Sequence, residues 1–176
     1  MIAFDDLKRD LSAGREHLLV VIAGVSEEQF KRRPSALPSD VEGSPNWSIA
    51  EILAYLLFSE RLWGTGIALA LTQDGVKVQA GALEAREEDA RRGRMAPVPQ
   101  LVHGLLASRR QVELLLDQAA ALEDGLQRYV LHPSDGRLTV EWMVREKVIA
   151  HEAALAARIE ALRSEMGLAA TAGATS

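Results

Sequence analysis

Residues 46–56 read NWSIAEILAYL, and this stretch contains the strongest helix-start signal in the chain. Ser48 stands at a predicted N-cap and Glu51 follows three residues later, which is the arrangement of a capping box. The residues that follow are apolar at helical spacing as far as about Thr72. The stretch therefore predicts a long helix that begins at residue 49 and lies in the core of the fold.

Three further long helices are predicted from the same kind of apolar spacing. They cover about residues 4–25, residues 97–124 and a segment after a predicted cap at Thr139. In each helix the apolar residues recur at intervals of three, four or seven, so they lie on one face. Four such helices predict an all-α fold, an antiparallel four-helix bundle over residues 1–165 with a flexible tail at 166–176.

The connections between these helices are predicted from turn residues. Ser26 caps one short helical turn, and residues 31–45 contain three prolines and read as a loop. Residues 73–96 form a polar connection that could cross the end of the bundle, with a short helix near residues 83–88. Residues 132–136, His-Pro-Ser-Asp-Gly, are typical of a turn.

Composition and charge exclude several classes of protein. The chain has 176 residues, a formal net charge of −5 and no cysteine. It therefore has no basic field for nucleic acid or anionic lipid, no disulfide and no thiolate ligand or nucleophile. Neither a signal-peptide pattern nor an apolar run of about 20 residues is evident, so we expect a cytoplasmic protein with no nucleic-acid and no membrane partner.

The helix that begins at residue 49 is apolar on more than one side. Ala54, Leu57 and Phe58 lie away from its inner stripe. A helix that is apolar nearly all round is buried on both faces. We therefore expect a homodimer in which this helix lies at the interface.

Three motifs in order resemble the DinB/YfiT-like family of helical-bundle proteins. Residues 47–56, WSIAEILAYL, are similar to the opening of the family's second long helix. Residues 132–142, HPSDGRLTVEW, are similar to the turn and GxLT sequence that lead into its last helix, and His151-Glu152 follows in that helix. The resemblance extends from about residue 4 to residue 163 and implies the bundle fold of the family.

The resemblance also implies a metal site, which this sequence has altered. Intact members hold a divalent ion, usually nickel or zinc, through one histidine of the second long helix and two of the last. The matching positions here are Tyr55, His151 and Leu155, so one of three ligands remains. Leucine cannot coordinate an ion, and a protonated phenol is a poor ligand. We therefore expect neither a bound metal nor another cofactor.

Three residues are candidates for a pocket between the second and last long helices. His151 is either a core histidine that hydrogen-bonds to Tyr55 or Glu60, or a polar group that binds a ligand or acts as a general base. Glu60 lies on the inner stripe, where it needs a partner such as His151 or Lys147, or lines a water-filled pocket. Tyr55 is either a packed aromatic ring or a hydroxyl that stabilises a bound thiolate or oxyanion.

Four other polar residues have plainer interpretations. His17 and His103 lie off the apolar stripes and are expected to face solvent. His132 is expected to brace the turn in which it lies, and the capping box accounts for Glu51 without any chemistry.

The sequence favours a small-ligand-binding or stress-related accessory protein that works without a metal. Two alternatives remain open. The resemblance implies a transferase or isomerase, metal-assisted or metal-free, that would use His151, Tyr55 and Glu60 on a low-molecular-weight thiol. The other alternative is a structural or interaction module that works through the dimer interface. The sequence does not decide whether the protein is an enzyme.

Overall fold

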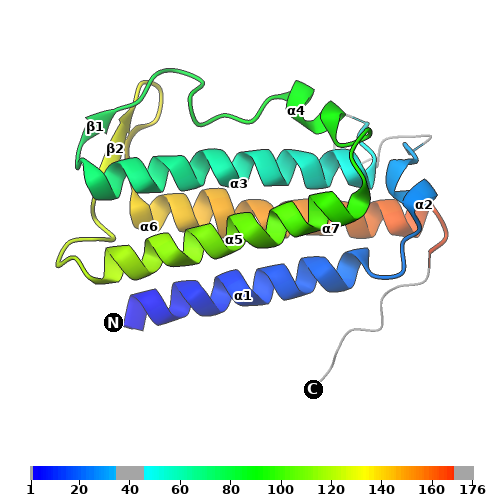
Figure 1. Ribbon diagram of the computed structural model, residues 1–176, viewed down its shortest axis with the longest axis horizontal. Coiled ribbons are helices and arrows are strands. Elements are labelled where there is room, and N and C mark those ends of the chain that lie inside the picture. The colour runs from blue at the N-terminus through cyan, green and yellow to red at the C-terminus, as the bar shows by residue number, and fades with distance from the viewer. Residues whose placement is uncertain (1, 35–45, 169–176) are drawn as a thin grey trace.

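Four long helices form the body of the molecule in the computed structural model, which describes residues 2–34 and 46–168 (Figure 1). They are α1 (Ile2–Ile22), α3 (Ile49–Thr72), α5 (Val98–Ala120) and a last helix of three consecutive segments, α6 (Val140–Trp142), the π-helix η1 (Met143–Ala150) and α7 (His151–Glu165). The predicted all-α four-helix bundle is confirmed.

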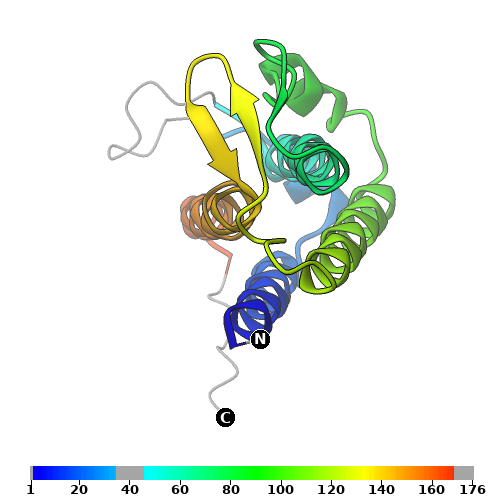
Figure 2. The same cartoon turned by 90° about the vertical axis from the view of Figure 1, so that its left-hand side faces the viewer.

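Along the bundle axis, α1 and α3 lie at opposite corners (Figure 2). Each of them packs against α5 and against the last helix. The C-terminal half of α1 shares an apolar cluster with the N-terminal half of α3 and the end of α7. The N-terminal half of α1 shares a second cluster with the C-terminal half of α3 and with η1. Consequently α1 and the last helix run in one direction and α3 runs in the opposite one.

The connection between α3 and α5 runs back along the bundle (Figure 1). It passes from β1 (Val76–Lys77), beside the C-terminal end of α3, to α4 (Glu87–Arg92) at the N-terminal end. There a Cβ atom on Gly93 would stand 2.4 Å from the carbonyl oxygen of Ala50, so only glycine fits without a shift. Because of this long return, α5 runs parallel to α3 and antiparallel to α1, an arrangement that helix counting alone could not give.

The predicted start signals form as expected. The hydroxyl of Ser48 accepts a hydrogen bond from the backbone N–H of Glu51 at 3.3 Å, and the Glu51 carboxylate accepts one from the backbone N–H of Ser48 at 2.8 Å. Ser26 caps the short helix α2 (Glu27–Lys31) in the same way. Thr139 caps α6 by accepting a hydrogen bond from the backbone N–H of Trp142 at 3.2 Å.

Three predicted boundaries are wrong. Helix α5 ends at Ala120 and not at residue 124. Helix α1 ends at Ile22 and not at residue 25, because Gly24 has a φ of 72° and turns the chain. The short helix of the connection begins at Glu87 and not near residue 83. Its start is fixed by Asp89, whose carboxylate accepts a hydrogen bond from the backbone N–H of Arg86 at 3.1 Å.

A small sheet beside the bundle was not predicted (Figure 2). Strand β2 (Tyr129–His132) pairs antiparallel with β3 (Gly136–Thr139) and parallel with β1. The predicted turn at residues 132–136 is confirmed and closes this hairpin, with a φ of 74° at Gly136. Strands of two and four residues are too short for a recognisable alternating pattern. Residues 169–176 of the predicted tail lie outside the described residues.

Helix α3 is long and apolar enough to cross a membrane by length and composition, but 61% of its most apolar 18-residue window is buried inside the bundle. A core helix passes the same test, so this finding is weak evidence for a membrane span.

Candidate functional site

The fold brings Tyr55 and His151 together between α3 and the start of α7. Their ring centroids are 5.6 Å apart and the rings meet edge to face at 63°. Leu155, one turn beyond His151, is buried in the apolar cluster against which Tyr55 packs. The three positions that the family resemblance marks as ligand positions are therefore close to one another.

Tyr55 and His151 line a pocket of about 260 Å³. Ser59 and Trp63 of α3, Lys147 of η1 and a segment of the long connection complete its wall. The remaining lining residues come from that segment and are Leu83, Glu84 and Ala85. The Nε2 atom of His151 is buried and has no hydrogen-bond partner among the described residues. The residues of the pocket wall thus include a histidine with an unused imidazole nitrogen, a phenol, a hydroxyl and an ammonium group.

Burial and nearby charges set the protonation of the two rings. Burial lowers the pKa of His151 below its ordinary value of 6.5, and the positive charge of Lys147 lowers it further. Burial raises the pKa of Tyr55, and the negative charge of Glu84 adds to that effect. Near neutral pH the imidazole is therefore uncharged and the phenol keeps its proton.

These donors do not fit a nickel or zinc ion held in the manner of the family. Such an ion needs at least three protein ligands, and here it would meet one neutral imidazole, one protonated phenol and the aliphatic side chain of Leu155. Within residues 2–34 and 46–168, no group of three or more histidine, aspartate or glutamate side chains is placed to hold a metal ion. A metal-free state stays a prediction, which the donor chemistry supports.

Glu60 does not belong to this pocket, and its expected pairing with His151 or Lys147 is wrong. Its carboxylate contacts the Arg15 guanidinium at 2.6 Å, the Arg109 Nε at 3.0 Å and the Ser108 hydroxyl at 3.0 Å. It is 2% exposed. A pocket of about 280 Å³ between α3 and α5 touches Glu60, but both carboxylate oxygens already have these partners.

Glu60 is part of a layer of four buried charged residues at the middle of the bundle. Arg15, Glu60, Arg109 and Glu152 come from α1, α3, α5 and α7 respectively, and we call them the ionic layer. Glu152 contacts Arg15 at 2.8 Å and Arg109 at 3.0 Å. None of the four is more than 5% exposed, and their formal charges cancel. The layer separates the two apolar clusters of the core.

Sequence reasoning missed Arg15, Arg109 and Glu152, although their spacing could have revealed them. Each lies four residues after one inward apolar residue and three before the next, as Arg15 does between Leu11 and Leu18. Glu60 has the same placement in α3. A charged residue at such a position must be buried, and four of them with cancelling charges indicate mutual pairing.

The ionic layer is not fully hydrogen-bonded. The Oε1 atom of Glu152 and the Nε and Nη1 atoms of Arg15 are buried with no hydrogen-bond partner among the described residues. Burial raises the pKa of Glu152 even though the charges of Arg109 and Arg15 oppose the rise. Burial lowers the pKa of Arg109. The layer therefore holds its charges at a cost in desolvation, and its mutual ion pairs are those of a structural element.

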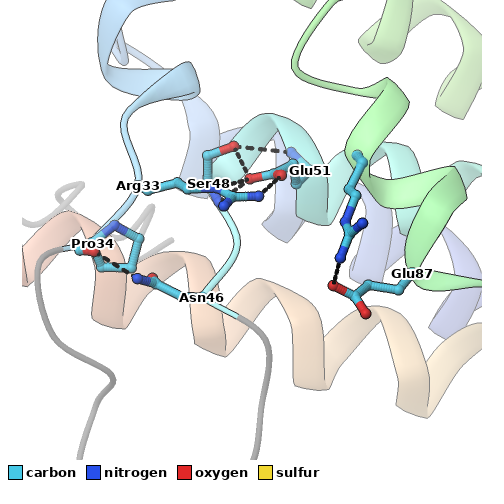
Figure 3. Close-up of polar contacts among 7 residues, drawn as sticks. Arg33, Pro34, Asn46, Ser48, Glu51 and Glu87 are labelled. Atoms are coloured by element: carbon cyan, nitrogen blue, oxygen red, sulfur yellow. Dashed lines mark hydrogen bonds and ion pairs between the residues drawn. The ribbon is translucent and has the colours of Figure 1, made fainter.

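Glu51 has structural partners only, as the capping box predicts. Its carboxylate is held by Ser48 and by the guanidinium of Arg33, whose Nε donates at 3.2 Å (Figure 3). Burial acts to raise the pKa of Glu51, but the hydrogen bonds from Arg33 and Ser48 prevail and lower it. The interaction joins the residues after α2 to the start of α3.

The other histidines take the places expected of them. His17 and His103 are exposed, and His17 lies 3.4 Å from the carboxylate of Glu160. His132 is buried and its Nδ1 accepts a hydrogen bond from the backbone N–H of Asp135 at 3.3 Å, so it braces the hairpin turn.

Comparisons with known proteins agree with this architecture. A family model described as the DinB superfamily matches residues 10–162. Among solved structures, the chain is similar to YfiT from Bacillus subtilis, described as a probable metal-dependent hydrolase with an unusual four-helix bundle topology. The TM-score is 0.73 at 15% identity, over 94% of this chain and 89% of that one, so the likeness concerns the fold. No curated protein matches the chain.

Proposed function

The chain belongs to the DinB superfamily, and from its altered site we propose that it binds a small organic ligand without a divalent metal. The proposed binding site is the pocket between Tyr55 and His151. The observation that carries the proposal is the buried Nε2 of His151, which has no hydrogen-bond partner in the described structure and belongs to a residue that lines a mostly polar pocket. A buried polar atom of this kind is stabilised when a ligand provides its partner.

The metal-free part of the proposal is tested by elemental analysis. Protein incubated with equimolar nickel or zinc and then desalted is expected to retain far less than one ion per chain. The matched control is the double variant Tyr55→His and Leu155→His, which restores three imidazoles and is expected to retain about one ion. Retention of about one ion per chain by the unaltered protein would contradict the proposal.

The ligand-binding part is tested by NMR with a library of small organic molecules. Members of the library are expected to shift the signals of the His151 and Tyr55 rings, while those of exposed His103 stay unchanged. If no compound moves the pocket signals, the protein does not use this pocket for small ligands.

For the alternative, a thiol-dependent transferase or isomerase, three pocket residues were expected to take part in the reaction, and Glu60 does not lie in the pocket. Glu60 is held within the ionic layer by Arg15 and Arg109, so a reaction in the pocket would have to proceed with His151 and Tyr55. The thiol remains one candidate among the ligands of the proposed site.

The expected homodimer stays a prediction, but two of the three apolar residues on which it rested are buried within one chain and are not available to a partner. Ala54 and Leu57 are buried within one chain, where Leu57 lies against Gly104 of α5. Phe58 is half-buried and lines a shallow pocket of about 220 Å³. If a dimer uses this face, Phe58→Asp should yield monomers by light scattering. An unchanged oligomer in that variant would rule the face out.

A further inference from the structure

Lys147 places an ammonium group at the wall of the pocket without an acidic partner. Its Nζ atom stands 5.3 Å from the ring centroid of Trp63 and 5.2 Å from that of Trp142. Within the described ranges no carboxylate forms an ion pair with it. The two indole rings, which meet edge to face at a centroid distance of 6.3 Å, hold the ammonium group in place.

Contact with aromatic rings does not neutralise this charge. A cation–π interaction orients the ammonium group, but the lysine keeps its full charge and free N–H donors. A half-buried charge of this kind is screened less by salt than one in open solvent. The pocket wall therefore attracts an anion.

Two neutral groups can complete the recognition of that anion. The Tyr55 hydroxyl keeps its proton and can donate a hydrogen bond, and the uncharged His151 ring can donate through Nε2. A carboxylate accepts several such bonds at once, and those from a charged donor are the strongest. Trp63 and Leu83, which are 6% and 1% exposed, form part of the apolar lining beside these polar groups.

The local backbone also sets this segment apart. Lys147 lies in η1, a π-helix of eight residues that ends directly before His151. A π-helix widens the helical turn, is rare, and occurs frequently at functional sites. This observation is independent of the side-chain contacts; the π-helix contains Lys147 and ends next to His151.

We propose that the pocket takes a small organic carboxylate, with the anionic group at Lys147 and an aliphatic body against Trp63 and Leu83. This inference rests on the proposed function and names its class of ligand. A volume of about 260 Å³ is small for a ligand site, so the body has only a few carbon atoms. A cationic ligand is disfavoured because the only carboxylate of the wall, Glu84, is exposed and its field is screened by water.

The test compares three probes of nearly equal shape, hexanoate, hexanamide and hexylamine, in calorimetric titrations at low salt. Hexanoate is expected to bind at least about tenfold more tightly than hexanamide, because only the carboxylate forms an ion pair with Lys147. Lys147→Gln should remove this preference. Lys77→Gln, which removes an exposed positive charge on β1, is the matched control and should keep it.

Each outcome separates this inference from the proposed function. If hexanamide or hexylamine binds as tightly as hexanoate, the pocket binds ligands but the carboxylate assignment is wrong. If none of the three probes binds while other library compounds do, the assignment is wrong as well. If no compound of any class shifts the pocket signals, the proposed function fails too. Should Lys147→Gln not fold, Lys147→Arg must retain the preference for the acid, and its loss there would overturn the inference.

Discussion

His151 and Glu152 are neighbours in the chain, yet they belong to two different buried polar regions. Glu152 points into the ionic layer, where it contacts two arginines within 3.0 Å. His151 lines the pocket, and its buried Nε2 has no hydrogen-bond partner in the described structure. The buried charges of the first region form ion pairs with one another, although several of their atoms lack hydrogen bonds, whereas the second region has an uncharged imidazole in the wall of a pocket. The difference teaches that burial of a titratable residue does not by itself mark a functional site.

The largest expected effect comes from breaking the ionic layer. Arg109→Leu should lower the free energy of unfolding by about 3–5 kcal/mol, because it leaves two buried carboxylates with one arginine between them. The measurement is urea denaturation followed by circular dichroism. Arg110→Leu is the matched control, because the side chain of Arg110 is 70% exposed and its one ion pair among the described residues is with Glu113. It should change stability by no more than about 0.5 kcal/mol. Equal losses in the two variants would contradict a structural role for the layer.

The same kind of substitution in the pocket should have a much smaller effect. We expect His151→Leu to change the free energy of unfolding by about 1 kcal/mol or less, since it removes a buried nitrogen that has no partner. Glu152→Leu, one residue further, should lose several times as much, because it leaves both arginines of the layer short of an anion. A large loss in His151→Leu would show that the histidine is a structural residue of the core and would weaken the ligand-binding proposal.

The smallest effect is expected in the pH dependence of stability. The pKa of His151 is lowered in the folded state, so the neutral ring favours folding above its ordinary value of 6.5, and this contribution is lost as the pH falls below that value. The pKa of Glu152 is raised, so its ionisation acts in the opposite sense, reducing stability as the pH rises above its ordinary value of 4.5. Between pH 7.5 and about pH 5.5, unaltered protein should therefore lose stability relative to His151→Leu in parallel urea titrations. A constant difference across this range would mean that His151 titrates as it does in the unfolded chain.

Part of the candidate site could be predicted from the sequence, because some of its residues belong to a family motif and others do not. Tyr55, His151 and Leu155 follow from the family motif, and the structure places them together. Lys147 gave no signal of its own, because a lysine on a helix is usually in solvent. Its role depends on Trp63 and Trp142, which come from different helices and meet only in the folded molecule.

The sequence by itself determined the four long helices and the capped starts at Ser26, Ser48 and Thr139, since capping boxes and apolar spacing depend on residues within one or two turns of each other. It also determined that the family's metal ligands are replaced, because that is a matter of side-chain chemistry. Only the tertiary structure decided the direction of α5, the partners of Glu60 and the separation of the ionic layer from the pocket. These depend on contacts between residues far apart in the chain, such as Arg15 with Glu60, whose separation is 45 positions and whose pairing no local pattern records.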